Sequence, residues 1–123
     1  EAYIEDDSSR GGGLAPGAPF VVLGDLNADP ENDGTFRQAI RALVSHDRVH
    51  PDATPTATTA GQAAFSNLDP DDTARWGKRV DYVLPSASLS IDTSGVWRPV
   101  APDTTAPPVS DHFPVWVDIR PQR

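Results

Sequence analysis

The chain has 123 residues, a length that suits a single domain. Its 18 Asp and Glu outnumber its 10 Lys and Arg, and the formal net charge of -8 argues against broad nucleic-acid binding, because a duplex-binding domain has to neutralise phosphates. Cysteine is absent, which excludes disulfides, thiolate zinc sites and a cysteine nucleophile.

The first 19 residues read as an irregular lead-in rich in glycine and polar residues, and residues 20–120 as the folded domain. No signal peptide is visible, and no apolar run approaches the roughly 18 residues of a membrane-spanning helix. The sequence contains no Met and opens at Glu1. We therefore expect a processed product or a piece of a longer chain.

Two elements are predicted early in the domain. The continuous apolar run at 20–24 predicts a buried strand. Residues 35–44 predict a helix, because apolar side chains recur there at helical spacing with polar ones opposite. Thr35 or Asp33 is the expected N-cap of that helix.

The rest of the chain predicts mainly strands. Residues 46–78 carry few periodic signals and are expected to form a functional surface loop or to be disordered, with 51–77 as the candidate substrate-selecting loop. Strands are then predicted at 79–84, where Pro85 stops the strand, at 88–98, broken around Gly95, and at 113–119. One helix with several strands predicts a mixed α/β or α+β sheet.

Asp25 and Asn27 follow the first predicted strand. If the chain stays extended there, both side chains point to one face, where a carboxylate and an amide suit a water and a phosphate oxygen. The alternative is a turn, because Asp and Asn readily bond their own backbone.

Asp81 lies inside an otherwise apolar predicted strand, where Asp is disfavoured. Its burial would be costly without a partner, and an imidazolium is one such partner. The alternative is a carboxylate on the solvent face of an edge strand, paired with Arg79.

Asp111 and His112 precede the last predicted strand. In an extended chain they point to opposite faces, so Asp111 is a candidate metal ligand or proton acceptor, while His112 is a candidate donor to a phosphoryl oxygen. His112 then needs an acceptor for its other ring nitrogen, which Asp81 can be. A turn Asp followed by a surface His is the alternative.

Two further groups are interpreted as loop residues. His46 and His50 have a metal-ligand spacing, but they follow the predicted helix and precede a proline. The acidic group of Asp69, Asp71 and Asp72 suits weak calcium binding, although a solvated loop explains it as well.

Three motifs in order resemble the endonuclease/exonuclease/phosphatase superfamily, whose members are similar to deoxyribonuclease I. They are Gly24-Asp25-Leu26-Asn27, Arg79-Val80-Asp81-Tyr82-Val83-Leu84 and Ser110-Asp111-His112. The resemblance covers residues 20–119 and corresponds to the C-terminal half of a four-layer α/β sandwich. The lead-in is also similar to that of secreted bacterial members.

The resemblance implies metal-dependent hydrolysis of phosphoesters. Asp25 would align or deprotonate the attacking water, Asn27 would orient the phosphate, and His112, held by Asp81, would stabilise charge on the phosphoryl oxygens. Asp25, Asn27 and Asp111 are the implied metal ligands, with magnesium or manganese as the expected ion and calcium as an alternative.

The resemblance also implies an Asn and a metal-binding Glu before Asp25, and Glu1 and Glu5 lack the expected strand. We therefore expect the N-terminal half of the sandwich as a missing partner and an inactive isolated fragment. The substrate that the resemblance implies is a nucleic acid or a small phosphoester such as a lipid head group or sugar phosphate. A non-catalytic binding module that retains the fold is the alternative function.

Overall fold

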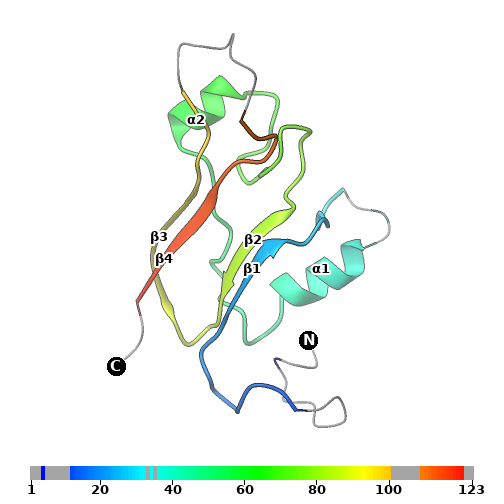
Figure 1. Ribbon diagram of the computed structural model, residues 1–123, viewed down its shortest axis with the longest axis vertical. Helices are drawn as coiled ribbons and strands as arrows, with labels where there is room; N and C mark the ends of the chain where they lie inside the picture. The colour runs from blue at the N-terminus through cyan, green and yellow to red at the C-terminus, as the bar shows by residue number, and fades with distance from the viewer. Residues whose placement is uncertain (1–3, 5–11, 33, 35, 101–108, 121–123) are drawn as a thin grey trace.

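The computed structural model describes residue 4 and residues 12–32, 34, 36–100 and 109–120. The described strands are β1 (Val21–Asp25), β2 (Asp81–Pro85), β3 (Ser90–Val96) and β4 (Val115–Arg120), and the helices are α1 (Arg37–Val44) and α2 (Thr59–Ala64). They form two antiparallel two-stranded sheets, β1–β2 and β3–β4, with α1 beside the first and α2 near one end of the second (Figure 1). The predicted mixed α/β character is confirmed.

The first sheet and α1 enclose one hydrophobic core. β1 pairs with β2 from Val21 opposite Pro85 to Asp25 opposite Asp81. Ile40 of α1 belongs to the same buried cluster as Tyr82 and Leu84 of β2, whereas Leu23 of β1 is exposed. The helix begins after Phe36, which makes no side-chain cap. The predicted caps, at positions 33 and 35, lie outside the described residues.

The prediction that 46–78 lacks secondary structure is wrong, because this segment contains α2. The role of 51–77 in substrate selection stays a prediction. The sequence of α2, Thr-Ala-Gly-Gln-Ala-Ala, lacks the large apolar residues that mark an amphipathic helix. Contacts with distant residues fix it instead. The guanidinium of buried Arg98 donates to the Gln62 side chain and to the backbone oxygens of Asp69 and Asp72.

The second sheet differs in detail from its prediction. β3 spans Ser90–Val96 rather than 88–98, and its irregularity is a bulge between Ile91 and Thr93. The chain is not broken at Gly95, which pairs with Trp116 on β4, where an added Cβ would meet the indole at 3.0 Å. Gly95 therefore makes room for an aromatic neighbour.

The strand directions bring polar residues to one end of the molecule. Because β1 and β2 are antiparallel, the last residue of β1, Asp25, lies beside the first residue of β2, Asp81. The start of β4 lies toward the same end (Figure 1), and β2 contacts β4. Asp81 is thus at a strand terminus rather than in the interior predicted for it. Among the described helices, none is long and apolar enough to cross a membrane.

Candidate active site

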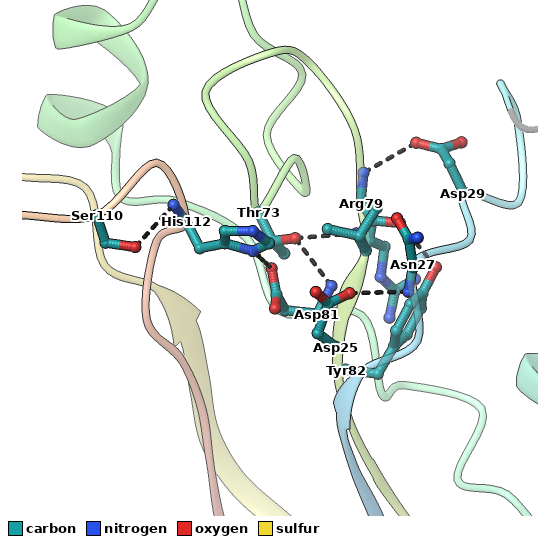
Figure 2. A network of polar contacts seen from close by, with 10 residues as sticks. Asp25, Asn27, Asp29, Thr73, Arg79, Asp81, Tyr82, Ser110 and His112 are labelled. Carbon is teal, nitrogen blue, oxygen red and sulfur yellow. Dashed lines mark hydrogen bonds and ion pairs between the residues drawn. The ribbon is translucent and has the colours of Figure 1, made fainter.

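Three residues from separate segments meet where β1 ends and β2 begins. Asp25, Asp81 and His112 each offer a ligand atom, and these atoms lie within 4.8 Å of one another. Figure 2 shows His112 reaching from the segment before β4 toward Asp81, with Asp25 alongside. The cluster joins positions 25, 81 and 112, so only the tertiary fold creates it.

His112 and Asp81 form the closest polar pair of the cluster. His112 Nδ1 lies 2.8 Å from Asp81 Oδ2. A carboxylate can only accept, so this contact places a proton on Nδ1. The hydrogen bond to Asp81 raises the pKa of His112 above its ordinary value of 6.5, although partial burial opposes the shift. The contact anticipated between these two side chains is therefore present.

Trp76 borders the same imidazole. Its ring meets the His112 ring edge-on, with centroids 5.0 Å apart and an interplanar angle of 83°. Trp76 is half exposed, so its indole forms part of the surface of the site. Sequence reasoning missed this residue, because an isolated aromatic in a long loop carries no periodic signal.

Thr73 joins the segments that carry Asp81 and His112. Its buried hydroxyl accepts hydrogen bonds from the backbone N–H groups of Val80 and Asp81, both at 3.0 Å. Its backbone oxygen accepts from the N–H of Phe113 at 2.7 Å. Ser110 adds a local turn, since its hydroxyl accepts from the N–H of His112 at 3.0 Å. One buried threonine thus fixes the relative position of the Asp81 and His112 backbones.

The chain bends sharply after Asp25. Asn27 has φ +47°, and its N–H donates to Asp25 Oδ1 at 2.8 Å. This is the left-handed conformation that Asn tolerates, closed by an Asp-initiated turn. The expectation of an extended chain from Asp25 to Asn27 is therefore wrong, and the alternation of side chains cannot place both on one face. The turn alternative describes the backbone correctly, yet Asp25 still reaches His112 and Asp81.

Asp29 anchors the loop that follows this turn. Its buried carboxylate accepts from the N–H groups of Glu31 and Asn32, both at 2.7 Å, and from the N–H of Arg79 at 2.9 Å. The Tyr82 hydroxyl donates to the Ala28 oxygen at 2.7 Å and binds the same loop. These bonds hold the segment after β1 against the start of β2. The sequence contained no sign that Asp29 would be buried.

Arg79 is a structural residue of the core. Its guanidinium donates to the Ala53 oxygen at 2.9 Å and lies over the Tyr82 ring. It is buried, and burial lowers its pKa. The alternative in which Asp81 pairs with Arg79 on a solvent face is wrong, because the Asp81 carboxylate pairs with His112.

Asp111 lies apart from the cluster. It is exposed, and its backbone oxygen accepts from the Arg75 N–H at 2.9 Å. Among the described residues, the grouped ligand atoms are those of Asp25, Asp81 and His112 and do not include Asp111. A metal-binding role for Asp111 or Asn27 stays a prediction.

The remaining polar groups have local roles. His46 and His50 each accept a backbone N–H two residues on, at 3.1 Å, as loop residues do. The Asp72 carboxylate accepts from the Asp69 N–H at 2.8 Å, and its burial raises its pKa. Turn formation accounts for these side chains.

The cluster opens into a large cleft of about 730 Å³. Its wall is mostly apolar and includes Leu23 and Trp97, which are 69% and 59% exposed, together with Val109. Asp25, Asp81, His112 and Arg75 supply charged groups at the same cleft. Polar chemistry therefore lies beside a broad apolar surface.

Comparison with known proteins identifies the family of this chain. The model of the endonuclease/exonuclease/phosphatase family matches residues 1–112, which include every residue of the cluster. The chain belongs to the endonuclease/exonuclease/phosphatase family. Searches of curated proteins and of solved structures gave no match. Members of this family are generally hydrolases of phosphoesters and typically depend on a divalent metal.

The donor atoms of the cluster fit such a metal. Magnesium and manganese prefer oxygen ligands, and Asp25 offers an exposed carboxylate. Asp81 uses Oδ2 for His112, which leaves its other oxygen. The donor chemistry therefore suits a hard divalent cation centred on Asp25, with Asp81 as the second carboxylate within reach.

Proposed function

We propose that this chain carries a catalytic cluster of a divalent-metal-dependent phosphoester hydrolase. The observation that carries the proposal is the convergence of Asp25, Asp81 and His112 in a chain of a phosphoester-hydrolase family. Each residue comes from a different motif of the sequence. A turn or a surface ion pair would explain any one of them but does not require all three to meet.

The geometry and the family likeness support the following roles. Asp25, an exposed carboxylate at the cleft, would align and deprotonate the attacking water. The hydrogen bond to Asp81 raises the pKa of His112, which favours the form with a proton on each ring nitrogen. The Nδ1 proton faces Asp81, so the Nε2 proton is free to stabilise charge on a phosphoryl oxygen. Asp81 would thus orient His112 and favour its protonated form.

A divalent cation, when bound at Asp25, would supply Lewis-acid stabilisation of the phosphoryl oxygens. Asn27 would orient the phosphate through its side-chain amide, a role that follows from the family motif. The same likeness supports the proposal that residues 20–120 form the C-terminal portion of a four-layer sandwich.

The test uses the parent protein, meaning the natural protein in which residues 1–123 occur. Asp25→Asn and His112→Ala should each lower kcat for bis(4-nitrophenyl) phosphate with magnesium or manganese by about 10²–10⁴-fold. EDTA should abolish hydrolysis, and added metal should restore it. Asp47→Asn is the matched control, because Asp47 is an exposed carboxylate of the loop after α1. Full kcat in Asp25→Asn would refute the proposal.

The isolated chain 1–123 is expected to be inactive, because the family's Asn and metal-binding Glu are not evident before Asp25. If purified 1–123 hydrolyses the substrate and Asp25→Ala abolishes this activity, the expectation of an inactive isolated chain is wrong, while the proposed function stands. The substrate class is tested by comparing DNA, RNA and small phosphoesters with the parent protein. The net charge of -8 leans toward small substrates.

A further inference from the structure

Arg75 has a distinctive position among the charged residues of the cleft. It lies in the loop before β2 and lines the cleft with Asp25, Asp81 and His112. Among the described residues that line it, Arg75 and His112 are the cationic ones. His112 already donates a hydrogen bond to Asp81. Arg75, by contrast, forms no ion pair with Asp25 or Asp81 among the described residues.

The guanidinium of Arg75 lies beside two aromatic rings. Its central carbon lies 5.2 Å from the Phe65 ring centroid and 5.3 Å from that of Phe113. Its Nε donates to the backbone oxygen of Ser110 at 3.2 Å, and its backbone N–H donates to Asp111. Arg75 is thereby fixed to the segment that ends in His112, with little side-chain freedom left to lose on binding.

These contacts leave N–H donors of the Arg75 guanidinium available to a ligand. A guanidinium has five N–H groups, and in the described part of the chain only the Nε–H of Arg75 has a hydrogen-bond acceptor. Other arginines are used differently. Arg98 bonds backbone oxygens, and Arg120 pairs with Asp92.

The charge balance of the cleft calls for such a donor. An anionic phosphoester that approaches Asp25 and Asp81 meets two carboxylates in a chain of net charge -8. A planar guanidinium presents two parallel N–H groups that match two oxygens of a phosphate.

We propose that Arg75 binds the phosphoryl oxygens of the substrate and positions them over the Asp25–His112 cluster. This rests on the proposed function for its phosphoester substrate, but the anion site stands on Arg75 itself. Cation–π contacts with Phe65 and Phe113 and the hydrogen bond to Ser110 hold the guanidinium, and its outer N–H groups make the contact with the phosphate. A purely structural Arg75 would only secure the Ser110 segment.

The first experiment measures binding of inorganic phosphate to the full chain by ¹H–¹⁵N NMR, without metal. Phosphate should shift the side-chain N–H resonance of Arg75. Arg75→Gln should raise the dissociation constant for phosphate at least about tenfold. Arg75→Lys keeps the charge and should recover part of the affinity. Arg37→Gln, an equal charge change at an exposed position of α1, should leave it unchanged. Absence of phosphate binding, or equal binding by the wild-type chain and Arg75→Gln, would overturn the inference.

The second experiment measures kinetics of the parent protein. Arg75→Gln should raise KM for bis(4-nitrophenyl) phosphate at least about fivefold, with the melting midpoint held within about 2 °C. An unchanged KM with a lowered midpoint would mean a structural role and would overturn the inference. If Asp25→Asn abolishes hydrolysis while Arg75→Gln alters neither KM nor phosphate binding, this inference fails and the proposed function stands. If no phosphoester is hydrolysed yet Arg75-dependent phosphate binding persists, the proposed function fails and the anion site stands.

Discussion

Replacement of Thr73 by valine tests how the site is held together. Valine has nearly the same shape but lacks the hydroxyl that accepts from the N–H groups of Val80 and Asp81. Leaving one buried donor without an acceptor costs about 1–3 kcal/mol, and water can reach the partly exposed Asp81 more readily than Val80. We therefore expect Thr73→Val to lower the free energy of unfolding by about 2–4 kcal/mol.

Urea unfolding of the full chain followed by circular dichroism measures this free energy, provided that the urea dependence is unchanged. Thr73→Ser keeps the acceptor and loses one buried methyl, so it should cost only about 1 kcal/mol. Thr93→Val, at an exposed position of β3, is the matched control and should stay within about 0.5 kcal/mol of wild type. Equal free energies of unfolding for Thr73→Val and Thr73→Ser would refute the hydrogen-bond argument.

Three further variants have expected outcomes. Asp81→Asn should lower the pKa of His112 toward 6.5 in an NMR titration with EDTA, because it removes the carboxylate that raises it. In the wild-type chain the Asp81–His112 pair stabilises the fold fully below pH 6.5, and this contribution is lost as pH rises through the raised pKa of His112. Asp81→Asn should therefore flatten the pH dependence of the free energy of unfolding, measured with urea. Thr58→Ala should cost about 0.5–2 kcal/mol by the same assay, because the Thr58 side chain caps α2 through the Gly61 N–H. Asp29→Asn should cost about 2 kcal/mol, because one of its carboxylate oxygens becomes a donor facing a backbone N–H.

Local pattern was enough to predict the elements that hold the first core. The continuous apolar run before Asp25 locates β1, and the helical spacing around Ile40 locates α1. The expectation that β1 is buried is wrong, because its residues are partly or fully exposed, Leu23 among them. Helix α2 could not be found in this way, because Thr58 and Arg98 fix a segment of small residues. A helix held by distant hydrogen bonds leaves no periodic trace.

The same distinction between local pattern and tertiary contacts applies to the candidate site. Asp81 and His112 could be paired from sequence, because a carboxylate in an apolar run needs a partner and a histidine needs an acceptor. Thr73 and Arg75 could not, because their roles depend on which backbone atoms and rings the fold places beside them. The turn at Asn27 reversed an expectation that assumed a continuous strand.

The apolar wall of the cleft also governs how the protein behaves in solution. At neutral pH the net charge of -8 keeps copies apart, but this repulsion vanishes near the isoelectric point of about 4.5 and is screened by salt. The exposed side chains of Leu23, Trp97 and Val109 then favour association of chains through the cleft mouth. Self-association at acidic pH would block the cleft and mimic the titration of a catalytic group. Activity profiles across pH therefore need a measurement of particle size at each point.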